Sequence, residues 1–552
     1  MPAPAPALTR REALAAAAMA AAAATLAGCA TTDDATTDDA TASDEAATST
    51  AATSQVIVAM GTSNEPSYGF DPVYGWGAGE HVHDPLVQST LVRTDANMEF
   101  ECDLATSYAC SDDGLTWTFE LRDDAFFTDG EQLTAADVAF TVNQIRATAA
   151  SETDLSVVEE AVATGELTVE LRLSKPCCAL LYTLAVVGIV PEHAWGEGYG
   201  AAPVGSGPYV LEQWDVGQQA IFAANPDYYG AQGSIERVVV VFMEEDAALA
   251  AARAGEVDLA YTSATYAEQE VEGYELTSIA TVDSRGVSLP VVASGATREQ
   301  GGTTYDAGND VTCHQEVRQA VSLAADREAM VDYVLGGHGE PAYSVGDGMP
   351  WASDDMQVEH DAQAACALLE GAGWTLGADG VYELDGTRCA LELYYPSSDS
   401  VRQALANELA NELAEVGIEL TLHGESWDVI YEHQFSDLVL WGWGSNSPMD
   451  VYELSHSDGT MNYSSFESDV TDAYLDRALA CTTVEDSYEL WQASEWDGSY
   501  GIAPQGEATW AWLVNVDHLY WRREGLDIGE QRLQPHGHGW SVLSNLNEWA
   551  WS

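Results

Sequence analysis

Residues 104–138 read LATSYACSDDGLTWTFELRDDAFFTDGEQLTAADV and hold the clearest structural signals of the chain. The SDDG stretch at residues 111–114 is typical of a turn, and residues 115–121 after it alternate apolar and polar side chains, which predicts a half-buried strand. A helix is expected to follow, because Thr134 is a good N-cap and Asp137 stands at its third position. A strand followed by a capped helix indicates an α/β protein.

The rest of the chain also alternates strands with helices, and it contains no repeat. Residues 55–60 and 238–242 are continuous apolar runs, typical of buried strands. Residues 401–416 have helical spacing, and residues 418–422 return to strand alternation. This order predicts an α/β fold with mixed sheets. Because 552 residues exceed one ordinary core, two or three packed units are expected.

The N-terminus has the pattern of an export signal. Arg10 and Arg11 precede an alanine-rich apolar run that ends at Gly28 and Cys29 and is too short to span a bilayer. We predict that residues 1–28 are a cleaved signal of the twin-arginine type. The segment resembles bacterial lipoprotein signals, which implies that Cys29 is the lipidation site. The alternative is an uncleaved amphipathic N-terminus.

Residues 29–54 are predicted to be a lipidated cysteine followed by a disordered acidic tether, since residues 30–54 hold no aromatic and no branched aliphatic side chain. The chain carries 90 acidic against 19 basic residues, a formal net charge of −71. This charge repels nucleic acid, which we exclude as a partner. The expected address is therefore the extracytoplasmic face of the cell membrane, periplasmic or on the cell surface, with the body held through the lipid anchor.

Eight cysteines follow Cys29, an even number in a chain that is expected to be exported. Disulfides are therefore permitted. The sequence-local possibilities are Cys102 with Cys110 and Cys366 with Cys389. The absence of a C-x-x-C pair disfavours a structural zinc site.

Several segments, in order along the chain, resemble the extracytoplasmic solute-binding proteins of the peptide and nickel type, the receptors of ABC importers. They are residues 104–138, 190–193, 205–209, 225–229, 255–259, 317–321 and 371–374. The resemblance implies a two-lobed, periplasmic-binding-protein-like fold with a hinge and an interlobe cleft. It places a first lobe at 55–285 and 490–552 and a second lobe at 286–489. It also implies a monomer whose partners are ABC permease subunits.

The best candidate for the cleft is LWGWGSNSPMD at residues 440–450, where tryptophans beside glycines offer flat apolar walls with room for a ligand. Peptide-binding relatives carry an aspartate at the position of Gly444, and Asp450 or another acid could substitute for it. The alternative is that the two tryptophans belong to the core of a lobe. The predicted ligand contacts here are Trp441, Trp443, Asn446 and Asp450.

A second aromatic cluster, residues 68–76, follows the first strand, where relatives place a loop at the cleft mouth. Tyr74 and Trp76 are the predicted ligand contacts there. An ordinary packed loop is the alternative.

Histidines provide a metal hypothesis. Two pairs are spaced i, i+2, which on an extended segment puts both rings on one side. A fifth histidine follows the tryptophan stretch. The candidate metal ligands are His81, His83, His536, His538 and His456. Structural or solvent-exposed roles for these histidines are the alternative.

The sequence holds no Gly-x-Ser-x-Gly elbow, His-Glu-x-x-His motif, phosphate loop or dinucleotide fingerprint. We therefore predict a protein that catalyses nothing and needs no cofactor. The predicted function is the capture of short peptides for an ABC importer. The alternative is a receptor for nickel held by small organic ligands, with nickel as the transported cargo. An adhesion or structural surface protein is a third possibility, for which no repeat array argues.

Overall fold

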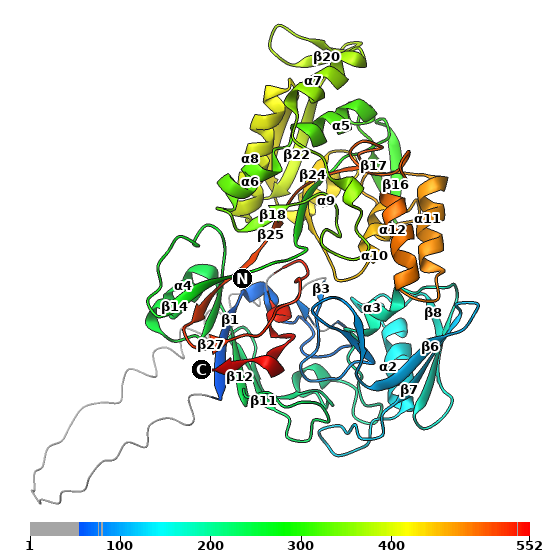
Figure 1. Cartoon of the computed structure of the whole chain (residues 1–552), viewed down its shortest axis with the longest axis vertical. Coiled ribbons are helices and arrows are strands. Elements are labelled where there is room, and N and C mark those ends of the chain that lie inside the picture. Colours follow the sequence, from blue (N-terminus) through cyan, green and yellow to red (C-terminus); the bar gives the residue numbers. More distant parts are fainter. Residues whose placement is uncertain (1–53, 76, 79–80, 538) are drawn as a thin grey trace, which may run out of the picture. The chain divides into compact units, whose positions relative to one another are not determined.

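The computed structural model describes residues 54–75, 77–78, 81–537 and 539–552, and these all belong to one compact unit (Figure 1). The predictions for the signal at 1–28, for Cys29, for the tether up to residue 53, and for Trp76 and His538 lie outside the described residues. Within the described ranges, no helix combines the length and the apolar character that crossing a bilayer requires.

A seven-stranded mixed sheet includes the first strand of the described chain. Its order is β10 (Tyr209–Asp215), β11 (Gln219–Ala224), β12 (Arg237–Phe242), β1 (Gln55–Met60), β13 (Leu259–Thr262), β26 (His518–Arg523) and β14 (Tyr274–Ile279). β1 runs parallel to β12 and β13, and the other pairs are antiparallel. The structure confirms the strands predicted at residues 55–60 and 238–242.

The stretch at 104–138 forms part of a four-stranded antiparallel sheet. Its order is β6 (Ala105–Cys110), β7 (Thr116–Leu121), β9 (Thr168–Leu173) and β8 (Val158–Ala163), and α2 (Ala135–Ala147) packs on it. The predicted strand and helix are confirmed: β7 alternates buried and less buried residues, and the Thr134 N–H donates to Asp137 Oδ2 at 2.9 Å. The short helix α3 (Leu180–Leu184) follows β9.

A six-stranded sheet forms the core of the other part. Its order is β18 (Gly339–Pro341), β25 (Trp510–Val516), β15 (Ser284–Ser288), β24 (Leu438–Trp443), β22 (Ala390–Pro396) and β23 (Glu419–Glu425). β22 is parallel to both β23 and β24. Side chains of α5 (Gln315–Ala324), α6 (Arg327–Val334), α7 (Ala362–Gly371) and α8 (Ser400–Glu415) share a core with this sheet (Figure 1).

The remaining elements are short. The helices are α4 (Glu245–Ala254), α9 (Trp427–His433), α10 (Met449–Ser455), α11 (Asp469–Leu479) and α12 (Tyr488–Glu495). The two-stranded pairs are β2 (Gly77–Ala78) with β3 (His81–Val82), β4 (Val92–Thr94) with β5 (Phe100–Cys102), β16 (Ala296–Gln300) with β17 (Thr303–Ala307), and β27 (Leu526–Asp527) with β28 (Ala550–Trp551). A three-stranded group contains β19 (Thr375–Leu376), β20 (Tyr382–Leu384) and β21 (Thr387–Arg388).

The chain passes between the large sheets at two crossovers, residues 280–283 between β14 and β15, and Asp517 between β25 and β26. The first lobe comprises the seven- and four-stranded sheets, and the second lobe the six-stranded sheet with its helices. β25 still belongs to the second lobe, so the chain rejoins the seven-stranded sheet at His518. The predicted lobe limits at residues 285 and 489 stay a prediction, because strand pairing alone does not report what moves together.

All eight cysteines of the described residues are free. Neither sequence-local disulfide is therefore present. Cys102 lies exposed in the β4–β5 pair while Cys110 ends β6, and Cys389 is buried at the start of β22 while Cys366 lies on α7. The cysteines of each predicted pair lie on different elements, so their spacing in the sequence did not predict a disulfide.

Candidate functional site

Three parallel strands of the second lobe end at one edge of the sheet. β22 leads into α8, β23 leads through Ser426 into α9, and β24 leads through residues 444–448 into α10. Ligands of open α/β sheets bind outside the carboxyl ends of the strands. This edge, which contains the predicted stretch 440–450, is therefore the candidate site.

An aromatic stack lies at the edge. Trp441 is only 4% exposed, and its ring stacks on Tyr463 at 4.2 Å and on Trp427 at 5.8 Å between ring centres. Its Nε1–H donates to Ser288 Oγ at 3.0 Å. Trp427 and Tyr431 on α9 are each 36% exposed. Trp441 thus acts mainly as a buried support, and the accessible aromatic surface belongs to two residues that the sequence analysis did not single out.

Trp443, whose ring centre lies 6.2 Å from that of Tyr463, is followed along the chain by Asn446 and Asp450. In the described part of the chain, Trp443 Nε1 and Asn446 Oδ1 are buried without a hydrogen-bond partner. Burial raises the pKa of Asp450 to about 6, against the opposing hydrogen bonds from Ser445. Its carboxyl group is therefore mostly ionised at neutral pH. An unpaired donor and an unpaired acceptor so close in the chain call for an explanation, and a bound ligand would supply one.

Two arginines converge on Gly442, between the tryptophans. Arg285 is the partner of Gly442 across the β15–β24 pair. A Cβ at Gly442 would overlap Arg402 Nη2 and the His536 ring, so the missing side chain makes room for both. The Arg402 guanidinium also lies 5.8 Å from the centre of the Trp427 ring. Burial, and then the charge of Arg285, lower the pKa of Arg402 to about 10.

The Asp283 carboxylate, at the first crossover, ties this edge to the C-terminal segment. It contacts Arg285 and His536 Nδ1, lies 3.3 Å from His518 Nε2, and accepts from the Gly537 N–H at 3.2 Å. Burial alone would raise the pKa of Asp283, but the charges of Arg285 and His536 and the His518 hydrogen bond hold it well below its usual value. We call Asp283, Arg285, His518 and His536 the crossover cluster.

Three of the predicted metal ligands, His83, His456 and His536, have other partners in the part of the chain that the structure describes. His83 is buried with Nδ1 2.9 Å from Ser541 Oγ, and His536 belongs to the crossover cluster. His456 is buried, stacks on Tyr452 at 4.4 Å between ring centres, and accepts a hydrogen bond from the Asp458 N–H. Within the described ranges, no group of three or more His, Cys, Asp or Glu side chains could hold a metal ion. His81 lies in β3, two residues before His83.

Tyr74 is held within the first lobe. Its ring stacks on Tyr68 at 4.9 Å between centres, and its carbonyl oxygen accepts from the Glu152 N–H at 3.1 Å. These contacts are those of a packed loop, the alternative left open for this cluster. Its part in ligand binding stays a prediction.

Two cavities lie away from the edge. One of about 500 Å³ is in the second lobe and includes Arg318, which pairs with Glu507 at 3.1 Å. Another of about 570 Å³ is in the first lobe and includes Arg532, which pairs with Asp84. The edge remains the better candidate site, because ligands of open α/β sheets bind outside the carboxyl ends of the strands.

Sequence reasoning found the tryptophans because an aromatic and glycine run is visible locally. It missed Arg285, Arg402 and Trp427, which come from three separate segments. The only local signal was Gly442 itself, a small residue held between two large ones.

Comparisons with known proteins agree with this architecture. Residues 99–465 match the family model of bacterial extracellular solute-binding proteins, family 5 Middle. Protein XP55 of Streptomyces lividans is 32% identical over 488 residues, which cover 84% of each chain.

Solved structures show the same fold. The chain is similar to NikZ from Campylobacter jejuni in complex with Ni(L-His), with a TM-score of 0.73 and 23% identity over 90% of this chain and 99% of that one. It is also similar to the oligopeptide-binding protein AppA from Bacillus subtilis in complex with a nonapeptide, with a TM-score of 0.67 and 21% identity over 90% and 99% of the two chains. The predicted two-lobed fold and the predicted resemblance are confirmed, and the chain belongs to the family 5 bacterial extracellular solute-binding proteins.

Proposed function

We propose that this chain is the receptor of an ABC-type importer and that it captures short peptides at the carboxyl edge of the six-stranded sheet. Membership of a solute-binding family supports the receptor role. In this proposal the ligand contacts both lobes, so binding favours the closed arrangement, which the ABC permease subunits recognise. A lipid on Cys29 holds the monomer on the extracytoplasmic face of the membrane.

The observation that carries the peptide proposal is the mixture of surfaces at the edge. Trp427 and Tyr431 offer exposed aromatic faces, and Trp441 supports them from behind. Beside them, the Trp443 Nε1–H is an unpaired donor and Asn446 Oδ1 an unpaired acceptor. A peptide unit has one acceptor and one donor, so it can satisfy both. Flat rings accommodate varied side chains at little entropic cost.

The arginine pair supports a second candidate, an anionic nickel chelate. Among the described residues, the Nε–H of Arg402 is buried without a hydrogen-bond partner, while Nη1 donates to Asp399, and a chelate with a free carboxylate could accept from Nε. His83, His456 and His536 are engaged with Ser541, Tyr452 and Asp283. The chelate would therefore be held through its organic ligands, and the metal would be cargo rather than cofactor.

Native mass spectrometry of the full chain, with a pool of di- to pentapeptides and separately with nickel plus histidine, distinguishes the two. We expect peptide adducts that survive a chelator. Trp427→Ala should weaken peptide affinity at least about tenfold, the usual effect of removing a central aromatic contact. The control is Tyr333→Ala on α6, where the side chain is 81% exposed and affinity should not change. A nickel adduct lost on chelation, with no peptide bound, would replace the peptide proposal with the chelate.

A further inference from the structure

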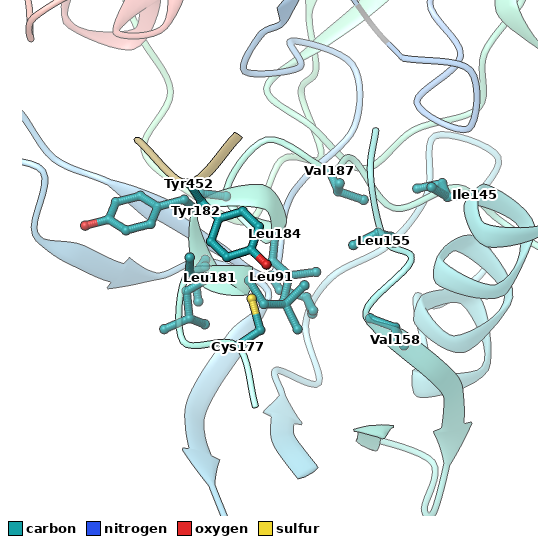
Figure 2. Close-up of a cluster of buried hydrophobic side chains, with 14 of the residues drawn as sticks. Leu91, Ile145, Leu155, Val158, Cys177, Leu181, Tyr182, Leu184, Val187 and Tyr452 are labelled. Atoms are coloured by element: carbon teal, nitrogen blue, oxygen red, sulfur yellow. The ribbon is translucent and has the colours of Figure 1, made fainter. Parts of the chain in front are cut away.

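The lobes also touch at a second place, which we call the distal contact. There the segment 175–184 of the first lobe meets α10, the end of α11 and the start of α12 of the second. The Cys178 N–H donates to the Leu479 carbonyl oxygen at 3.0 Å, and Tyr182 Oη lies 3.3 Å from Tyr488 Oη. Figure 2 shows Tyr452 of α10 in one cluster with Cys177, Leu181 and Tyr182.

α11 and α12 belong with the second lobe, because α12 forms hydrogen bonds to it and α11 packs against α12. Gln492 Nε2 donates to the Pro350 carbonyl oxygen at 3.1 Å, and the Ser353 N–H donates to Glu495 Oε2 at 2.8 Å. The segment 175–184 is in turn fixed to the first lobe, since the Ser174 N–H donates to the Val157 carbonyl oxygen at 2.9 Å. The Cys178 to Leu479 hydrogen bond therefore joins two separately anchored parts.

Two thiols meet at this bond. Cys178 Sγ lies 3.2 Å from the Ala478 carbonyl oxygen. Cys481 Sγ lies 3.5 Å from the Arg477 carbonyl oxygen and 3.5 Å from that of Asp486. Since residues 477 and 478 are consecutive, both sulfur atoms lie at the C-terminal end of α11. The main chains come together within two residues of Cys481, and such an approach is what a disulfide requires.

We propose that Cys178 and Cys481 form a redox-sensitive pair whose disulfide locks the distal contact closed. The oxidant is a low-molecular-weight disulfide. The Cys481 thiolate attacks one of its sulfur atoms and releases one thiol. The Cys178 thiolate then attacks the Cys481 sulfur and releases the second thiol. Two protein thiols are oxidised to one disulfide, the small disulfide is reduced to two thiols, and the two protons pass to the released thiolates.

The surroundings fix the order of these steps. Burial raises the pKa of both thiols, that of Cys178 to about 12, and Cys178 is buried whereas Cys481 is partly exposed. The first attack therefore comes from Cys481, and Cys178 resolves the mixed disulfide only when the lobes meet. Proteins outside the cytoplasm meet oxidants of this kind. The effect of the disulfide on ligand exchange rests on the proposed function, but its formation does not.

The test treats the full chain with oxidised glutathione, blocks the remaining thiols, and maps linked peptides by mass spectrometry without reduction. We expect a peptide pair joining Cys178 to Cys481 that is two hydrogen atoms lighter than the sum of its parts. Cys481→Ser should abolish the link. Cys389→Ser is the control, since Cys389 is buried in the core of the second lobe and should leave the link intact.

Backbone amide hydrogen exchange of residues 175–184 then measures whether the disulfide holds the distal contact closed. Oxidation should slow exchange there by at least tenfold, reversibly on adding dithiothreitol, and Cys481→Ser should not respond. Two results would overturn the proposed pair: glutathione adducts on Cys481 without any protein disulfide, or a disulfide from Cys177 in place of Cys178. A Cys178–Cys481 link with unchanged exchange would overturn the lock. Failure to bind peptides would instead count against the proposed function and leave both results standing.

Discussion

The crossovers and the distal contact each bury a carboxyl group, but in opposite electrostatic settings. Asp283 at the crossover faces Arg285, His518 and His536, and these hold its pKa well below the usual value although burial opposes them. Glu495 on α12, behind the distal contact, is 1% exposed; burial, with a smaller contribution from the charge of Asp347, raises its pKa to about 8. The crossover is stabilised when the Asp283 carboxyl group is ionised, whereas the distal contact is stabilised when the Glu495 carboxyl group is neutral. The same change in pH or charge should therefore affect them with opposite sign.

The largest effect is expected from Asp283→Asn, which leaves Arg285 and two imidazoles without their carboxylate. Uncompensated buried charge typically costs about 3–5 kcal/mol, so the free energy of unfolding should fall by that amount at pH 7. Because the folded pKa is depressed, the stabilisation by Asp283 is present above the unfolded pKa of about 4. It is lost only as pH falls through the lower folded value. Denaturant titrations between pH 3 and 7 measure both quantities.

The matched control is Asp517→Asn at the other crossover. The carboxylate of Asp517 accepts from Ser278 Oγ at 2.6 Å in an exposed setting, so less than about 1 kcal/mol should be lost. Equal losses in the two variants would mean that the crossover cluster has no special role.

Glu495→Gln should have the opposite sign. The folded pKa lies above the unfolded one, so the wild-type chain loses stability as pH rises from about 4.5 towards 8, where the buried group must ionise. Glutamine cannot ionise and keeps an oxygen for the Ser353 N–H. We expect the variant to be about 2 kcal/mol more stable than wild type at pH 6 and equal to it near pH 4.

Asp347 provides the check on this result. Burial raises its pKa to about 6, so part of the pH dependence near that value should persist in Glu495→Gln. If the variant loses as much stability between pH 4.5 and 8 as the wild type does, Glu495 is not the titrating group.

Gly442→Ala tests whether space, as well as charge, maintains the edge. The new methyl group would overlap the Arg402 and His536 side chains, and relief requires one of them to move. Overpacking of this kind costs about 1–3 kcal/mol, and peptide affinity should fall with it. Gly196→Ala, where no atom lies within 4 Å of the new Cβ, is the control and should change stability by less than about 0.5 kcal/mol. Thermal unfolding measures the stability of both variants, and peptide titration measures their affinity. Equal stability and equal affinity in Gly442→Ala and Gly196→Ala would show that the edge is not tightly packed.

The local signals of the sequence predicted local structure well. The turn at 111–114, the strand after it and the Thr134–Asp137 cap depend on neighbours in sequence, so they could be identified without a fold. The edge could be predicted only in part. Gly442 meets Arg285 because β15 and β24 pair in one register, and Arg402 arrives from another helix.

The histidine pairs, whose metal role stays a prediction, show the same limit. The i, i+2 spacing suggested shared metal ligands, but His83 is used by Ser541 and His536 by Asp283, partners more than 250 residues away along the chain. Nothing near either histidine in sequence indicates those partners. Long-range pairing of strands decided which polar groups met.

The smallest expected effect concerns the distal contact itself. Tyr182→Phe removes the hydroxyl that lies 3.3 Å from Tyr488 Oη and keeps the ring, which packs 5.2 Å from the centre of the Trp351 ring. Loss of one such hydrogen bond costs about 0.5–1.5 kcal/mol. Burial raises the pKa of both phenols, so neither ionises between pH 5 and 9, and the loss should not vary with pH as that of Glu495→Gln does. A double-mutant cycle with Tyr488→Phe isolates the coupling. Coupling above about 2 kcal/mol would mean that the distal contact is held by polar groups, as the crossovers are, and the contrast between the two junctions would fail.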